Sequence, residues 1–127
     1  MGELRVEATH ERSGQRIHTD APPDNHGRGE AFSPTDLLCT SLACCMITVM
    51  GIEAERTKIP LTRANALITK HMRSNPRRVG KIQVDLEIEG VGLTVEQRDA
   101  LERAALTCPV ALSLHPDLEQ EVLFSYT

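Results

Sequence analysis

The segment from Leu37 to Ile52 carries no charged residue over 16 positions, and this feature most limits how the chain can fold. A membrane-spanning helix needs roughly 20 apolar residues. This run is shorter and contains Thr40, Ser41 and Thr48. A helix that is apolar on all sides is typical of a protein interior. The sequence therefore predicts a long core helix, and we expect no membrane partner.

Three residues predict where this helix begins. Ser33 suits the capping position, Pro34 suits the first helical position, and the carboxylate of Asp36 faces the positive end of the helix. We expect the helix to extend to about Arg56. The spacing i, i+3, i+4, i+7 predicts a shared core face made of Leu38, Ser41, Leu42, Cys45, Thr48, Val49 and Ile52.

The remaining elements follow from alternation, turn residues and caps. Thr94 and Gln97 form a predicted capping box, and Pro109 ends that helix and begins a short one. Alternating apolar residues and flanking turn signals predict strands at 4–8, 15–18, 61–72, 81–89 and 122–126. Because strands and helices do not alternate regularly, we expect an α+β fold in one domain, residues 1–127. One small sheet covers only one side of an apolar helix, so we also expect a homodimer.

Composition excludes some classes of function. The net charge is −4, and the aromatic residues are limited to two Phe and one Tyr, so the chain is not expected to bind nucleic acid. Arg73, Arg77, Arg78 and Lys81 form a local basic cluster, which we interpret as a solvated turn. The N-terminus lacks the pattern of a signal peptide, so we expect a cytoplasmic protein with reduced thiols.

The four cysteines are core filler, metal ligands or redox groups. Cys45 is predicted on the core face, and Cys108 lies between two helices, where a helix N-terminus favours a thiolate. If those helices cross, the two thiols can meet and support a peroxidase cycle. Burial preference alone favours inert filler for any one Cys, and Cys39 and Cys44 are interpreted so. The five His residues lack ligand spacing, so no metal and no cofactor are expected.

Three motifs together resemble the OsmC/Ohr family, which includes organic hydroperoxide reductases. They are residues 33–38 (SPTDLL), residues 42–45 (LACC) and residues 108–110 (CPV), and the resemblance extends from about residue 3 to the end. It implies an OsmC-like fold with antiparallel sheets packed around the long central helix. It also implies an intertwined homodimer with two active sites at the subunit interface.

The resemblance implies roles for individual residues. Cys45 matches the peroxide-attacking cysteine, and Cys108 matches the resolving cysteine. Arg12 is the best match to the arginine that stabilises the thiolate, and Arg16 is second. Thr35 stands where the peroxidases carry the glutamate that holds this arginine, so the candidate supporting carboxylates are Asp36 and Glu30.

Two functions remain open from the sequence. The first is a thiol-dependent peroxidase of the oxidative stress response, which reduces organic hydroperoxides to alcohols through a Cys45 sulfenate and a Cys45–Cys108 disulfide. An external dithiol would recycle that disulfide. The alternative is a non-catalytic dimer that binds a small apolar ligand or senses oxidation.

Overall fold

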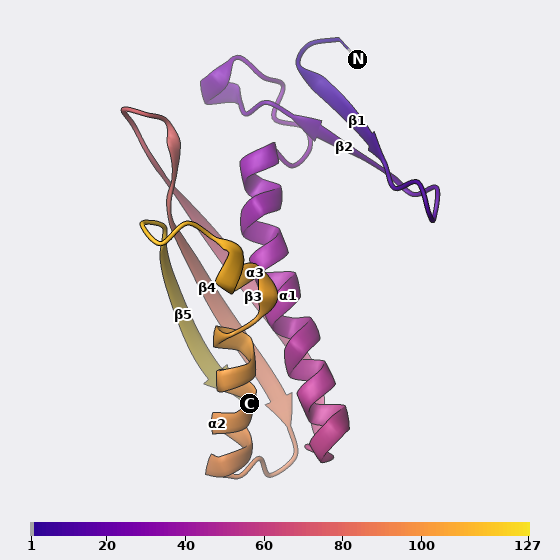
Figure 1. Ribbon diagram of the computed structural model, residues 1–127, viewed down its shortest axis with the longest axis vertical. Coiled ribbons are helices and arrows are strands. Elements are labelled where there is room, and N and C mark those ends of the chain that lie inside the picture. The colour runs from indigo at the N-terminus through magenta and orange to yellow at the C-terminus, as the bar shows by residue number, and fades with distance from the viewer. Residues whose placement is uncertain (1) are drawn as a thin grey trace. The chain divides into compact units, whose positions relative to one another are not determined.

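A computed structural model describes residues 2–127 and contains two sheets (Figure 1). The chain forms two compact units, which meet in sequence between residues 38 and 39. A two-stranded sheet belongs to the first unit and a three-stranded sheet to the second. The predicted order of strands and helices is confirmed, with one added 3-10 turn, η1 (Pro23–Asn25).

The first unit is built on a β-hairpin. Strands β1 (Arg5–Thr9) and β2 (Arg16–Asp20) pair antiparallel, one or two residues from the predicted bounds. The turn between them closes through the Gly14 amide, which donates to the His10 carbonyl at 2.7 Å. Gly14 has φ +76°, a conformation that glycine adopts without steric cost.

Helix α1 (Pro34–Thr57) begins and ends almost where the sequence predicts. The Asp36 amide donates to the Ser33 hydroxyl oxygen at 3.0 Å, and the Ser33 amide donates to the Asp36 carboxylate at 3.0 Å. This reciprocal pair satisfies two amides that have no partner within the helix itself. The first turn of α1 is therefore fixed by residues that the sequence identifies.

The predicted core face of α1 is wrong. The side chains that are buried lie on a neighbouring stripe: Cys39, Leu42, Ala43, Met46, Met50 and Ala54. Ser41, Thr48 and Ile52, which the prediction placed in the core, are exposed. Because α1 is apolar on nearly every side, periodicity gave no contrast from which to choose the face. Within the single chain, α1 is thus buried on one side and uncovered on the other.

The second sheet contains β3 (Leu61–Arg73), β4 (Arg78–Gly90) and β5 (Glu119–Tyr126), in the order β3-β4-β5. Strands β3 and β4 form an antiparallel hairpin, as expected. Strand β5 pairs with β4 in parallel, so the expectation of purely antiparallel sheets is wrong for this ladder. A parallel neighbour requires a crossover, and here helices α2 (Val95–Leu106) and α3 (Pro109–Ser113) provide it.

One hydrophobic core joins the helices of the second unit to one face of its sheet. The inward residues of β4 alternate along the strand and are almost fully buried: Ile82, Val84, Leu86 and Ile88. The same cluster includes the buried stripe of α1 and Leu101 and Ala105 of α2, and both helices lie over that face (Figure 1). The α+β fold class is confirmed.

Helix α1 is long and apolar enough to cross a membrane by length and composition alone. The core helix of a soluble protein meets the same criterion. In this chain, six side chains of α1 are buried in the core, which accounts for its apolar composition.

Candidate functional site

The structure brings the thiols of Cys45 and Cys108 together, although they are 63 positions apart in the sequence. The side chains of Cys108 and Cys45 are close enough that Cys45 contributes to the raised pKa of the Cys108 thiol. Cys45 is partly buried beside the core stripe of α1, and Cys108 is 1% exposed. Two cysteines in contact can exchange between a dithiol and a disulfide without a large movement of the chain.

Cys108 is held by the start of α3. It is the N-cap residue of this helix, its sulfur accepts a hydrogen bond from the Ala111 amide at 3.4 Å, and Pro109 takes the first helical position. The Gln120 side-chain amide donates to the Ala111 carbonyl at 3.0 Å and so fastens α3 to β5. The Cys108 thiol is therefore positioned by the crossover that makes β5 parallel to β4.

Burial raises the pKa of the Cys108 thiol. The Ala111 amide opposes this effect by lowering the pKa, and the contact with Cys45 raises it further. The helix N-terminus was expected to favour a thiolate at Cys108, but the cost of burying a charge is larger. Cys108 thus stays protonated at neutral pH, and its S–H can donate to the Cys45 sulfur.

The other two cysteines lie away from this contact. Cys39 is 2% exposed and packs in the core, as core filler does. Cys44 follows a different pattern, because it lies on the uncovered side of α1 and is exposed. The interpretation of Cys44 as core filler is therefore wrong within the single chain, because core filler is buried. Cys44 and Cys45 point about 100° apart around the helix, so Cys44 is a natural comparison for Cys45.

The candidate arginines belong to the other compact unit. Arg12 lies in the exposed turn between β1 and β2 and makes no ion pair within residues 2–38. Arg16 is exposed on β2, and its guanidinium lies 3.9 Å from the Glu7 carboxylate on the neighbouring strand. Of the two, Arg12 has its guanidinium available to a ligand.

The candidate carboxylates are engaged elsewhere in their own unit. Asp36 accepts the Ser33 amide in the cap of α1. Glu30 lies 2.6 Å from the Arg28 guanidinium and 3.5 Å from that of Arg5. Both carboxylates therefore already have partners other than Arg12.

The first unit contains a buried ion pair that the sequence analysis did not predict. Arg5 donates to both Asp20 carboxylate oxygens, at 2.7 and 2.8 Å, and the Glu30 amide adds a third hydrogen bond at 3.0 Å. Asp20 is fully buried. The Arg5 guanidinium lowers the pKa of Asp20 to about 2. Arg5 faces Asp20 in the register of β1 and β2, so this pair becomes visible only once the two strands are paired.

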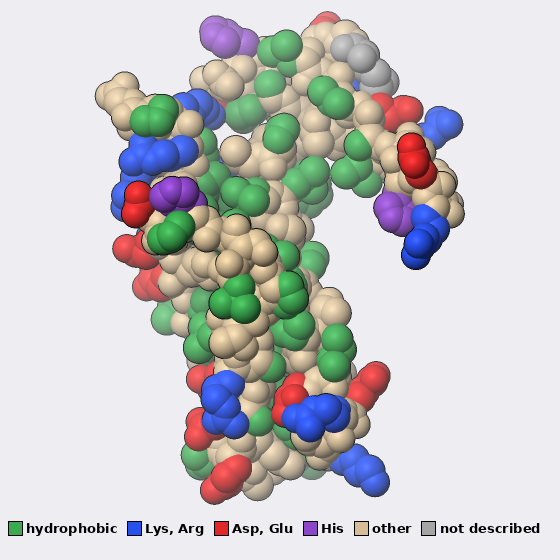
Figure 2. Space-filling model, viewed as in Figure 1, with side chains coloured by type: hydrophobic (Ala, Val, Ile, Leu, Met, Phe, Trp, Pro, Cys, Tyr) green, Lys and Arg blue, Asp and Glu red, His purple; other side chains and the backbone are tan. Residues whose placement is uncertain are grey.

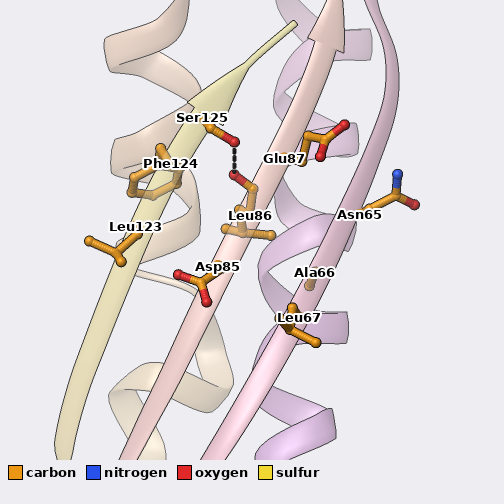
Figure 3. Close-up of a pocket in the computed structure, with 9 residues that line it drawn as sticks. All are labelled: Asn65, Ala66, Leu67, Asp85, Leu86, Glu87, Leu123, Phe124 and Ser125. Carbon is orange, nitrogen blue, oxygen red and sulfur yellow. Dashed lines mark hydrogen bonds between the residues drawn. The ribbon is translucent and has the colours of Figure 1, made fainter.

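A hollow of about 370 Å³ lies on the outer face of the three-stranded sheet (Figure 3). Leu67, Asp85 and Leu123 line up across its three strands. Its lining contains no cysteine, so it is separate from the thiol pair. Among residues 2–127, no group of three or more His, Cys, Asp or Glu side chains is placed to hold a metal ion.

The family model described as "OsmC-like protein" matches residues 27–122. The chain belongs to the OsmC-like family. The matched range contains both Cys45 and Cys108 and the whole crossover from β4 to β5. No curated protein matches the chain.

Solved structures with the same fold are named for stress and hydroperoxide resistance. A structure from Psychrobacter arcticus 273-4 is titled an osmotic-stress-induced and detoxification-response protein. It is 46% identical, with a TM-score of 0.91 over 98% of this chain and 90% of that one. An organic hydroperoxide resistance protein from Elizabethkingia anophelis is 15% identical, with a TM-score of 0.78 over 100% of this chain and 92% of that one.

A third structure, from Vibrio cholerae, is titled an organic hydroperoxide resistance protein with captopril bound in one of its active sites. It is 18% identical, with a TM-score of 0.73 over 99% of this chain and 86% of that one. The family model and the 46% identical structure thus place the chain in the OsmC-like family, and the two less similar structures share its fold.

Proposed function

We propose that this OsmC-like chain is a thiol-dependent peroxidase that reduces organic hydroperoxides to alcohols. The observation that carries the proposal is the proximity of the Cys45 thiol, beside the core stripe of α1, to the buried Cys108 thiol at the start of α3. A reactive cysteine needs a resolving partner within reach to avoid irreversible oxidation. The names of related proteins from the same family point to the same substrate class.

The first half of the cycle is the attack of the Cys45 thiolate on the terminal oxygen of the hydroperoxide. The O–O bond breaks, the sulfur keeps that oxygen as a sulfenic acid, and the remaining alkoxide takes a proton and leaves as an alcohol. Arg12 is proposed to stabilise the thiolate and to polarise the peroxide, because a guanidinium favours a neighbouring negative charge. No cofactor is needed for this step.

In the second half, the Cys108 sulfur attacks the Cys45 sulfur and an S–S bond forms. The Cys108 proton and the sulfenic hydroxyl leave together as water. An external dithiol then reduces the disulfide by two successive exchanges and is itself oxidised to a disulfide. The raised pKa of Cys108 suits this order, because Cys108 stays protonated while Cys45 reacts.

We also propose that the protein acts as a cytoplasmic homodimer. The uncovered side of α1 presents Ser41, Cys44, Thr48 and Ile52 to solvent within the single chain, and Ile52 is 58% exposed. An uncharged helix surface that exposes a large aliphatic side chain is normally covered by another protein surface. Light scattering at micromolar concentration tests this proposal, and a mass equal to that of one 14.0 kDa chain contradicts it.

Intact-mass analysis after one equivalent of an organic hydroperoxide tests the chemistry. We expect the wild-type chain to lose two hydrogens, and Cys45→Ser to show no change. Cys108→Ser should accumulate a sulfenic or further oxidised product. Cys44→Ser is the matched control, because it removes the neighbouring exposed thiol and should behave as wild type.

Turnover separates the peroxidase from the alternative. With excess dithiol, the wild-type chain should convert hydroperoxide to alcohol repeatedly, and Arg12→Ala should slow this conversion. Oxidation that occurs once and is never followed by turnover would indicate a sensor. The absence of any mass change would leave the non-catalytic dimer.

A further inference from the structure

The β3–β4 hairpin is the basic part of an acidic chain. Six of the 14 Lys and Arg residues, and none of the 18 Asp and Glu residues, lie between Leu61 and Val84. This segment therefore carries a charge of +6, and the rest of the chain carries −10. Such segregation creates a local field that attracts negatively charged partners.

The basic residues gather at the end of the hairpin where β3 turns into β4. Arg73, Arg77 and Arg78 are all exposed there. Arg73 and Arg78 are direct cross-strand neighbours, and like charges in that position destabilise a sheet. Figure 2 shows Lys and Arg side chains gathered over this end of the hairpin. The fold thus holds like charges together although their repulsion destabilises this end of the hairpin.

Two of these arginines are also held against the backbone of the hairpin. Arg78 donates to the carbonyls of Pro76 at 2.8 Å and Ser74 at 3.2 Å, across the turn. Arg73 lies over Gly80, where an added Cβ would sit 2.4 Å from its Cγ and Cδ atoms. Among residues 2–127, neither guanidinium has a carboxylate partner. A fixed guanidinium loses little freedom when it binds a carboxylate, so these groups are prepared for one.

Acidic residues form the border of this basic surface. Lys81, the next cation along β4, is already neutralised by Glu121 at 2.7 Å and Glu119 at 3.3 Å. Asp117 and His115, together with Arg78, line a hollow of about 360 Å³ beside the hairpin. A continuous polyphosphate would have to cross these carboxylates. A compact group of carboxylates on a protein surface can bind the arginines without approaching these acidic residues.

The basic surface lies in the same compact unit as the thiol pair. Helix α3, which Cys108 caps, has five residues and is about 7.5 Å long. It leads directly to His115 and so to the hollow beside Arg78. A standard interface covers about 800 Å² on each partner, so a partner docked on the arginines can extend along α3 towards the thiol pair.

We propose that the end of the β3–β4 hairpin docks an acidic partner protein that carries the reducing dithiol. This inference rests on the proposed function, since that function requires an external reductant. The partner's thiolate attacks the Cys45 sulfur of the Cys45–Cys108 disulfide and releases Cys108. The partner's second thiol then attacks the partner's sulfur in the mixed disulfide and releases Cys45, so that two electrons and two protons pass to this chain and the partner leaves as a disulfide.

Two synthetic peptides of equal length test the proposal. Both contain Cys-Gly-Pro-Cys, which is flanked by glutamates in one peptide and by glutamines in the other. We expect the glutamate peptide to reduce the wild-type disulfide at least about 10-fold faster at low salt. This ratio should fall toward 1 in about 0.5 M salt, where exposed charges are screened. Equal rates at low salt would overturn the proposal.

Variants locate the docking surface. Arg73→Glu combined with Arg77→Glu should remove the preference for the glutamate peptide. The matched control combines Lys58→Glu with Arg63→Glu, which changes the charge equally but away from the hairpin end, and it should keep most of the preference. Gly80→Ala displaces Arg73 without a change of charge and should weaken the preference. If the control loses as much as the hairpin variant, net charge explains the effect and the docking site is wrong.

Direct binding separates this proposal from the proposed function. A glutamate peptide with Ser in place of both Cys should bind the reduced wild-type chain more tightly than the hairpin variant, whether or not a hydroperoxide ever forms the disulfide. Tighter binding of single-stranded DNA or of anionic vesicles, lost in the same variant, would instead assign the surface to nucleic acid or lipid and overturn the proposal.

Discussion

Oxidation of Cys45 and Cys108 to a disulfide should stabilise the folded chain. The two cysteines are 63 positions apart, so the bond closes a long loop in the unfolded chain. The chain-entropy relation gives about 4 kcal/mol for a loop of this length at 25 °C. Because the two thiols are already in contact in the folded state, little of this gain should be lost to rearrangement.

We therefore expect a gain of about 2–4 kcal/mol in the free energy of unfolding, the lower value allowing for strain in the native state. For a chain of this size, this corresponds to roughly 8–16 °C in Tm. The assay is urea unfolding and thermal melting of the dithiol and disulfide forms at one fixed chain concentration, since association also shifts apparent stability.

Cys45→Ser, treated with the same oxidant, controls for oxidation elsewhere and should show no gain. Cys44→Ser should show the full gain. A disulfide form that melts at the same temperature as the dithiol form, or below it, would refute the reasoning. In that case the contact between the two sulfurs would not be suited to a bond, and the fold would have to open for the proposed cycle to proceed.

Two further predictions follow from single features of the structure. Asp20 has a pKa of about 2 in the folded state, below its ordinary value. Its pair with Arg5 therefore stabilises the first unit above about pH 4, and this contribution is lost as the pH falls towards 2. The protection of amides in β1 and β2, relative to their intrinsic exchange rates at each pH, should fall over that range in wild type but change less in Asp20→Asn, and identical profiles would contradict the assignment. Thr94 and Gln97 exchange hydrogen bonds of 3.1 and 3.0 Å in the capping box of α2, and Thr94→Ala removes this box. The substitution should lower the free energy of unfolding by about 1 kcal/mol, or the Tm by roughly 3–5 °C, as measured by calorimetry. Thr94→Ser keeps the hydroxyl and is its control, and an equal loss there would show that the hydroxyl is not responsible.

Local signals in the sequence predicted the elements well. The caps at Ser33 and Thr94, and the alternation along β4, depend on neighbouring residues only, and each is confirmed. The face of α1 was assigned wrongly, because a helix without polar contrast has no preferred side until the sheet and α2 pack against it. The direction of β5 was also missed, since alternation is the same in parallel and antiparallel strands.

The candidate site was predictable only in part. Cys45 and Cys108 were identified from motifs in the sequence. Their proximity depends on the packing of α1 against α3, which no local pattern encodes. The pair between Arg5 and Asp20 was missed, because two charged residues 15 positions apart look solvated until the loop that follows β2 covers them. The same holds for the arginines of the β3–β4 hairpin, whose exposure and fixed geometry are properties of the turn.

The parallel pairing of β5 has a consequence for the newly made chain. The β3–β4 hairpin forms from near neighbours, whereas β5 reaches β4 only after α2 and α3 have been synthesised and folded back. Cys45 therefore leaves the ribosome well before the residue that would protect it from overoxidation. A chain truncated within α2 would expose the first sulfur without the second, so damage at Cys45 should be heaviest in unfinished chains.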